Sequence, residues 1–185
     1  MPEKNINSTT MLPAALRPTP DESGMTVPQL LEHRINALFE QIPLVAELGE
    51  AFAQAGHDLY LVGGSVRDAL MGRLGHDLDF TTDARPDDTE AILRQHTHAT
   101  WDIGRAFGTI GAQIDDWVVE VTTYRADAYH PDSRKPEIVY GETLKDDLIR
   151  RDFTVNAMAL HAATRTFSDP YAGLTDIVSG ILRTP

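Results

Sequence analysis

Hydrophobic residues between positions 28 and 56 recur every three to four residues, which is the spacing of amphipathic helices. Pro43 interrupts the pattern, and because proline breaks helical hydrogen bonding the pattern predicts two helices. Gly56 follows at a position typical of a helix C-terminus. The apolar positions that carry the pattern are Leu30, Leu31, Ile35, Leu38, Phe39, Val45, Leu48 and Phe52.

After Gly56 the pattern becomes strand-like, with short apolar runs closed by glycine or by acidic pairs. The predicted elements are, in order, a buried strand at 59–62, a tight turn at 63–64, a helix at 65–71, a strand at 77–82, a helix at 86–96, and a hairpin of strands at 107–114 and 117–124. The hairpin is expected to turn at Asp115 and Asp116.

The last third begins with a polar, proline-containing segment at 125–137 that predicts a loop. Thr143 and Asp146 have the spacing of a capping box, which predicts a helical stretch that continues through Leu160. A turn and strand at 162–169 and a short helix at 176–180 complete the pattern. Mixed helices and strands favour an α/β class, or α+β with a small mixed β-sheet flanked by helices.

The length of 185 residues predicts one domain, or one domain with an appendage. Residues 1–27 lack sustained periodicity and are expected to be a mobile N-terminal extension. Residues 28–56 are expected to form N-terminal helices, and residues 57–185 the main domain.

Charge and composition exclude several classes of protein. The net charge of −12 argues against nucleic-acid binding over the whole surface, but it leaves room for a local basic site and suits the binding of divalent cations. The absence of cysteine excludes disulfides and thiolate chemistry. The sequence predicts no membrane-spanning segment and no export signal, so a cytoplasmic protein is expected.

Asp77 and Asp79 are the first candidate for chemistry. They lie two residues apart on a predicted strand, where alternate side chains share a face, so both carboxylates are expected on one side. Adjacent carboxylates repel each other and become stable together when they share a cation. Mg²⁺ prefers oxygen ligands and is commonly held by carboxylates together with substrate phosphates. Taken alone, this spacing in an acidic protein favours two solvated acids at a strand edge.

The turn from Gly63 to Asp68 weakens that interpretation. Gly63 and Gly64 join a buried strand to the start of a helix, where backbone N–H groups and the helix dipole attract anions. Ser65 adds a hydroxyl donor, and Arg67 adds a guanidinium group suited to a phosphate. A glycine turn with a surface arginine is the alternative interpretation.

Two further candidates lie downstream. Glu120 is a lone acid in an apolar strand and is either outward-facing or a third metal ligand. Arg150, Arg151, Asp152 and Asn156 are expected on one helix. They suit a triphosphate and a ribose, but they fit equally a solvated face with pairs four residues apart. The histidines are not expected to be ligands, because Mg²⁺ favours oxygen.

Together these motifs resemble the head domain of the class II CCA-adding tRNA nucleotidyltransferases and of the bacterial poly(A) polymerases that share it. The segments that carry the resemblance are LVGGSVRDALMGRLGHDLDFTTDA, GRAFGTIGAQIDDWVVEVTTYR, YHPDSRKPEIVYGETLKDDLIRRDFTVNAMAL and DPYAGLTDI. The resemblance runs from about Leu59 to Pro185. It implies a DNA polymerase beta-like nucleotidyltransferase fold for residues 57–185.

The resemblance implies a role for each candidate residue. The implied metal ligands are Asp77 and Asp79, with Glu120 as a third catalytic acid. The implied triphosphate turn consists of Gly63, Gly64, Ser65 and Arg67. The implied sugar- and phosphate-binding motif consists of Arg150, Arg151, Asp152 and Asn156. Arg105 aligns with a basic position near the primer or the phosphates, and residues 124–136 resemble a loop that helps to select the base.

The activity implied by the resemblance is template-independent transfer of CMP and AMP from CTP and ATP to the 3′ end of tRNA. Two Mg²⁺ ions would assist the transfer, and pyrophosphate would leave. Two departures from the family pattern stand out. His76 occupies the position of a usual lysine, and the family's neck, body and tail, which hold most of the tRNA, would follow Pro185. The chain is therefore expected to be a head domain without those parts.

Three other interpretations stay open from the sequence. The first is the head domain of a poly(A) polymerase, which shares the chemistry. The second is a nucleotide-binding module that has no turnover of its own and needs a separate body polypeptide. The third is a structural remnant that binds only Mg²⁺; the retention of both aspartates and of the RRDFTVNA segment disfavours it.

Overall fold

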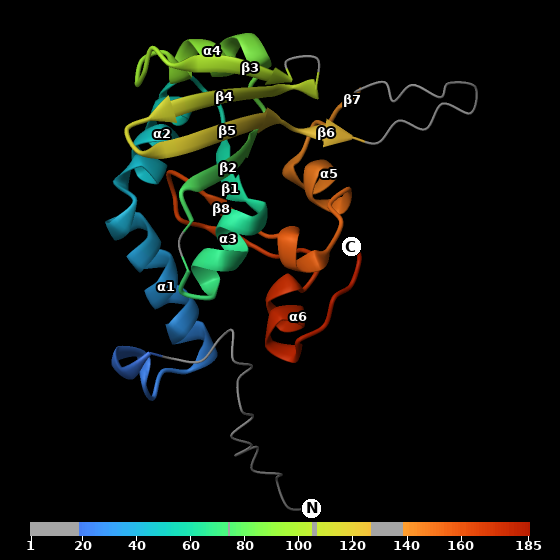
Figure 1. Cartoon of the computed structure of the whole chain (residues 1–185). Coiled ribbons are helices and arrows are strands. Elements are labelled where there is room, and N and C mark those ends of the chain that lie inside the picture. Colours follow the sequence, from blue (N-terminus) through green and yellow to red (C-terminus); the bar gives the residue numbers. More distant parts are fainter. Residues whose placement is uncertain (1–18, 74, 105–106, 127–138) are drawn as a thin grey trace, which may run out of the picture.

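The computed structural model describes residues 19–73, 75–104, 107–126 and 139–185. A mixed seven-stranded sheet in the order β3-β4-β5-β2-β1-β8-β9 forms its centre. The strands are β1 (Leu59–Val62), β2 (Asp77–Thr82), β3 (Thr100–Gly104), β4 (Thr109–Ile114), β5 (Trp117–Thr123), β8 (Ala159–His161) and β9 (Phe167–Ser168). A separate pair is formed by β6 (Arg125–Ala126) and β7 (Val139–Tyr140). The expected mixed sheet flanked by helices is confirmed (Figure 1).

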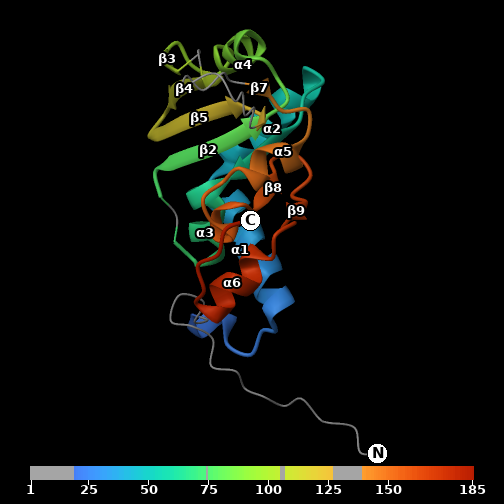
Figure 2. The same ribbon diagram turned by 90° about the vertical axis from the view of Figure 1, so that its right-hand side faces the viewer.

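The helices differ in length and in the part of the sheet that they contact. They are α1 (Val27–Gln41), α2 (Pro43–Gln54), α3 (Gly63–Leu70), α4 (Pro86–Leu93), α5 (Leu144–Ile149) and α6 (Gly173–Ser179), with 3-10 turns η2 (Pro20–Glu22) and η4 (Thr154–Asn156). Helices α1 and α2 lie to one side of the sheet, and α5 lies above α6 near the C-terminal end of the chain (Figures 1 and 2).

The main hydrophobic core lies between one face of the sheet and helices α1 to α4, and α6 adds Ile177 to it. Its side chains come from alternate strand positions such as Leu61, Phe80 and Val121, and from helix positions such as Leu48 and Leu93. A smaller cluster around Val62 and Leu148 packs α5 against β1 and β8. Since Val62 neighbours Leu61 on a strand, this second cluster lies on the opposite face. Further along that opposite face, β2 carries Asp77, Asp79 and Thr81, and β5 carries Glu120 and Thr122 together with Val118.

Several sequence predictions are confirmed by this structure. Pro43 is the first residue of α2, so it divides the two N-terminal helices as expected. Strand β2 has the predicted bounds, and the hairpin of β4 and β5 turns at Asp115 and Asp116. Thr143 and Asp146 form the predicted capping box, in which Thr143 Oγ1 accepts from the Asp146 backbone N–H.

The helix predicted to run through Leu160 is wrong. It ends at Ile149, and a 3-10 turn and strand β8 occupy the rest of that stretch. The Asp152 side chain accepts hydrogen bonds from the Phe153 backbone N–H and from the Asn156 side chain. Such local side-chain bonds compete with helical ones, and this explains the break.

Other boundaries also differ from the prediction. Gly63 and Gly64 are the first residues of α3 rather than a turn that precedes it. Helix α4 ends at Leu93 instead of His96, and α6 begins at Gly173 instead of Asp176. Strand β3 was not predicted, and the predicted 125–137 loop begins with the two residues of β6.

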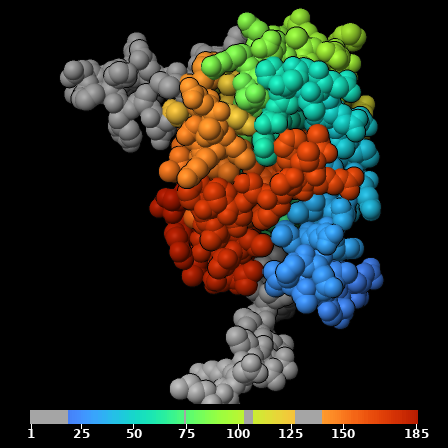
Figure 3. Space-filling model, turned by 180° about the vertical axis from the view of Figure 1, so that it is seen from behind, coloured from blue at the N-terminus to red at the C-terminus, as the bar shows by residue number. Residues whose placement is uncertain are grey.

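The N-terminal and C-terminal parts of the chain meet on the rear surface (Figure 3). Arg165, in the turn between β8 and β9, donates a hydrogen bond to Asn36 Oδ1 and lies 4.7 Å from the centre of the Phe39 ring. Glu22, which precedes α1, is buried and forms an ion pair with Arg34. None of the helices in the described segments is long and apolar enough to cross a membrane.

Candidate active site

The three candidate acids lie on one face of the sheet. Asp77 and Asp79 alternate with the buried Leu78 on β2, as the strand pattern predicts. Strand β5 runs parallel to β2, and its Glu120 is the Cα partner of Asp79. Opposed residues of neighbouring strands project to the same side, so Glu120 joins the two aspartates rather than pointing away.

The electrostatics of the site reflect this crowding. Burial raises the pKa of the Asp79 carboxyl, the nearby Arg151 opposes that rise, and Asp77 adds to it. Burial likewise raises the pKa of Glu120, and the charges of Asp79 and Asp77 raise it further. A site in which carboxylates raise the pKa of their neighbours, as at Asp79 and Glu120, gains stability from a cation. Across the described segments, no set of three or more acidic or histidine side chains has metal-ligating geometry by itself.

The N-terminus of α3 lies directly beside these acids. A methyl group at Gly63 would lie 3.8 Å from Asp79 Oδ2 and 3.2 Å from Arg151 Nη1. The first backbone N–H groups of any helix have no intrahelical acceptor, and at this helix end no side chain caps them. Such a helix end attracts anions, but the role of Gly63 and Gly64 in binding a triphosphate stays a prediction.

Ser65 links α3 to β2, the strand that carries Asp77 and Asp79, by hydrogen bonds. Its hydroxyl accepts a hydrogen bond from the Asp79 backbone N–H at 3.1 Å and donates one to the Asp77 carbonyl at 3.2 Å. Because the hydroxyl hydrogen is used by Asp77, the donors left for an anion at this turn are the backbone N–H groups. A direct contact of Ser65 with a triphosphate stays a prediction.

Arg67 links the turn to the downstream motif. Its Nε and Nη2 donate to the two carboxylate oxygens of Asp68, each at 3.0 Å, and its Nη1 donates to Asn156 Oδ1 at 2.6 Å. Asn156 in turn donates from Nδ2 to Asp152 Oδ1 at 2.9 Å. The structure therefore joins Arg67, Asn156 and Asp152 in one network, although they do not share a helix.

Arg151 is held beside the acids by a buried partner. Its Nη2 donates to Asp147 Oδ2 at 2.8 Å, and the Asp147 side chain is only 2% exposed. Its Nε is buried and has no hydrogen-bond partner. Arg150, by contrast, is exposed on the surface. Of the adjacent arginines, Arg151 thus lies against Gly63, while Arg105 falls outside the described residues.

Arg125 is a basic residue of the site that the sequence motifs did not single out. Its Nη2 donates to Thr109 Oγ1 at 2.8 Å, and its backbone N–H donates to Asp147 Oδ1 at 3.4 Å. Burial lowers the pKa of its guanidinium group, and the nearby positive charges of Arg150 and Arg151 lower it further. A lone arginine at the end of an apolar strand is a weak sequence signal. The structure thus gathers arginines where the sequence showed only one adjacent pair.

A family model and individual relatives assign the chain to the same family. The model of the poly(A) polymerase head domain matches residues 59–183. A CCA-adding enzyme of Staphylococcus aureus (strain MRSA252) is 41% identical over 150 residues, which cover 80% of this chain and 35% of that protein.

Solved structures agree with this match. The CCA-adding enzyme of Bacillus stearothermophilus, in complex with CTP, is 35% identical with a TM-score of 0.66, over 77% of this chain and 33% of that one. A tRNA nucleotidyltransferase complexed with a primer tRNA and an incoming ATP analogue is 30% identical with a TM-score of 0.59, over 74% and 38% of the two chains. The chain thus spans about a third of the length of these relatives. With its acids, its glycine-led helix and the matched residues in agreement, the chain belongs to the poly(A) polymerase head domain family.

Proposed function

We propose that this chain is the catalytic head of a nucleotidyltransferase that adds CMP and AMP, from CTP and ATP, to the 3′ end of tRNA. The observation that carries the proposal is the meeting of Asp77, Asp79 and Glu120 with the uncapped N-terminus of α3 and with Arg151. The named activities of the matched relatives support the same chemistry. We also propose a cytoplasmic location, where these substrates occur.

The site fits a pair of Mg²⁺ ions as cofactor. Asp77 and Asp79 would hold the ions, and Glu120 would add negative charge beside them, because Mg²⁺ binds through one or two carboxylates and completes its shell with phosphates and water. The raised pKa values of Asp79 and Glu120 support this fit, since a cation relieves the repulsion that opposes their ionisation. When bound, the ions would lower the pKa of the attacking hydroxyl and stabilise the leaving pyrophosphate.

The protein's own groups would bind and orient the nucleotide. The backbone N–H groups that begin α3, from Gly63 and Gly64 onward, would hold the β- and γ-phosphates, and Arg151 would add positive charge beside them. Its buried, unpartnered Nε fits an anionic ligand nearby. The network of Arg67, Asn156 and Asp152 would position the sugar. Positioning and charge stabilisation account for most of the catalysis in such transfers.

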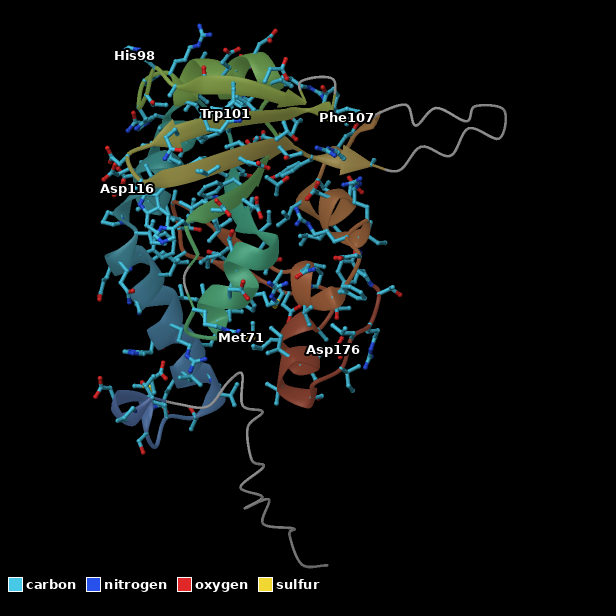
Figure 4. All side chains as sticks on the ribbon, in the orientation of Figure 1. Met71, His98, Trp101, Phe107, Asp116 and Asp176 are labelled. Carbon is cyan, nitrogen blue, oxygen red and sulfur yellow. The ribbon has the colours of Figure 1, made fainter. Side chains whose placement is uncertain are left out.

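The test is a primer-extension assay on tRNA that lacks its 3′ end, with each of the four nucleoside triphosphates offered separately, alongside Mg²⁺-dependent CTP and ATP binding. We expect incorporation from CTP and ATP and its loss in Asp77→Ala/Asp79→Ala. Asp116→Ala, an exposed acid in the β4–β5 turn, is the matched control (Figure 4). Transfer by the double variant would overturn the assignment of the acids.

A second candidate, poly(A) synthesis, is favoured by the description of the matched family. The same assay separates the two activities. Repeated addition from ATP alone, with no use of CTP, would support poly(A) synthesis and would contradict CCA addition.

A further inference from the structure

Trp101 lies in a row of residues that crosses the sheet and ends at the proposed metal site. Its Cα pairs with Gly111 on β4, Gly111 pairs with Glu120 on β5, and Glu120 pairs with Asp79 on β2. Opposed residues of neighbouring strands project to the same side, so the indole and both carboxylates share one face of the sheet. With strands about 4.8 Å apart, three steps place Trp101 roughly 14 Å from Asp79.

Solvent reaches both ends of this row, because Asp79 and Glu120 are partly exposed at one end and Trp101 is exposed at the other. Trp101 is one of the large hydrophobic residues that are exposed, at 38%. Gly111, between Trp101 and Glu120, is buried by its neighbours and adds no side chain of its own to the row. Figure 4 places Trp101 on the upper strands, whereas Met71, at the end of α3, lies far below them. An exposed indole in line with a charged site is therefore a candidate contact for substrate.

The direction of the proposed reaction places one substrate over this row. In phosphoryl transfer the attacking and leaving oxygens lie roughly in line, on opposite sides of the phosphorus. If the triphosphate is held at the N-terminus of α3, the pyrophosphate leaves toward α3 and β1. In the strand order β3-β4-β5-β2-β1, the attacking hydroxyl then approaches from the side of β5, β4 and β3. That side carries Gly111 and Trp101.

We propose that Trp101 stacks on a base near the 3′ end of the single-stranded nucleic acid that is extended. This inference rests on the proposed function and adds a primer subsite to it. Every base has a π-face, so an indole binds without selecting sequence. A stacked strand rises about 3.4 Å per nucleotide, and the row of roughly 14 Å therefore corresponds to one of about the last four nucleotides.

The first test uses the protein's own fluorescence. Trp101 and Trp117 are the two tryptophans, so Trp117→Phe leaves Trp101 as the sole tryptophan, whose emission is followed with excitation that avoids tyrosine. A short single-stranded RNA with a free 3′ hydroxyl is titrated in the presence of Mg²⁺ and CTP. Stacking predicts saturable quenching of Trp101. Unchanged fluorescence up to millimolar RNA would overturn the proposal. That result is expected if this face binds a protein instead of RNA.

The second test separates stacking from apolar contact. Trp101→Leu keeps an apolar side chain but lacks a π-face, and RNA binding should weaken by roughly five- to a hundredfold. Trp101→Phe keeps an aromatic ring and should lose no more than about threefold. Leu182→Ala, an exposed apolar residue on the C-terminal segment, is the surface control. Equal RNA affinity in the parent protein and in Trp101→Leu would overturn the proposal.

The third test locates the base and isolates this proposal from the proposed function. A single abasic nucleotide is moved along the last positions of the RNA. At the stacked position, Trp101→Leu should cause no further loss of affinity, because residues in direct contact are not additive. Additive losses at every position would contradict stacking. CTP affinity is measured in the same proteins: its absence in the parent refutes the proposed function, whereas its presence with unchanged RNA binding refutes only the role of Trp101.

Discussion

Gly63 and Arg151 lie so close that a Cβ atom at Gly63 would be 3.2 Å from Arg151 Nη1. Gly63 also has a φ of +66°, which is a left-handed conformation that other residues adopt at a cost. The first residue of α3 is therefore restricted both by its backbone and by the arginine beside it.

This contact predicts the outcome of Gly63→Ala. The added methyl group should lower the free energy of unfolding by about 1 kcal/mol through backbone strain, and it should weaken CTP binding by displacing Arg151. Gly56→Ala is the matched control, because Gly56 has a φ of +85° and nothing within 4 Å of its added Cβ. Both variants should lose stability in thermal unfolding, but only Gly63→Ala should lose CTP affinity. Equal CTP binding by the two variants would contradict the role of this contact.

Asp79→Asn should stabilise the metal-free protein at neutral pH. Burial raises the pKa of Asp79 in the folded state, so its ionised form opposes folding at pH values above its ordinary range. Asparagine removes this charge with little change in shape. The melting temperature in EDTA should rise, and the stabilisation that Mg²⁺ and CTP give together should disappear. A lower melting temperature of Asp79→Asn in EDTA would show that the ionised Asp79 does not destabilise the metal-free protein.

Metal affinity should fall as the pH falls, and the fall should begin at a higher pH than for ordinary carboxylates. The pKa values of Asp79 and Glu120 are both raised, so protons compete with the cation above the normal range of these side chains. Titration with Mn²⁺, a spectroscopic substitute for Mg²⁺, at several pH values between about 4 and 7 measures this effect. The lower limit is the ordinary pKa of a carboxyl group, which is about 4. Proton release should accompany binding. A metal affinity that stays constant until the pH reaches the ordinary pKa of carboxyl groups would contradict the prediction.

Arg151→Ala should reduce both stability and nucleotide binding. The variant leaves Asp147, whose side chain is 2% exposed, without its ion-pair partner, which should cost roughly 3 kcal/mol because Arg151 itself is partly exposed. Adding Asp147→Asn should restore most of the stability, because the unpaired buried charge is removed. CTP affinity should stay low in the double variant. Recovery of CTP binding together with stability would assign Arg151 a purely structural role.

The Glu22–Arg34 ion pair predicts an acid-sensitive contribution to stability. Hydrogen bonds from Arg34 lower the pKa of Glu22 from 4.5 to about 2. Its stabilising effect is therefore complete above pH 4.5 and is lost as the pH falls toward 2. Glu22→Gln should lower the stability at pH 7 and should flatten its pH dependence across that window. Chemical denaturation at several pH values measures both effects, and parallel curves for parent and variant would contradict the assignment.

The sequence predicted the parts of the fold in which one local signal dominates. Alternation on β2 gave its bounds and placed Asp77 and Asp79 on one face. Pro43 separated two amphipathic helices. Strand β3 (Thr100–Gly104) was missed because its alternation of polar and apolar residues is only five residues long and ends in a glycine, and its pairing with β4 is irregular between Trp101 and Gly104.

The sequence could not predict contacts that depend on long-range packing. The stretch from Ala157 to Leu160 is apolar, and an apolar run this short fits a buried helix or a strand equally well. Its pairing with β1 decides for a strand. The position of Arg125 beside Arg151, and the buried bond of Arg34 to the Leu70 carbonyl, join residues far apart in the chain. No spacing rule connects such residues.

The bridge that Ser65 makes to both sides of Leu78 has a mechanical consequence. Because one hydroxyl is bonded to the backbone of Asp77 and of Asp79, α3 cannot slide along β2 without breaking two hydrogen bonds at once. The uncapped N-terminus of α3 and the carboxylates of β2 therefore keep a fixed separation before any ligand arrives. Ligand binding then carries no free-energy cost for ordering these groups, and folding alone fixes the distance that a bound ligand must span.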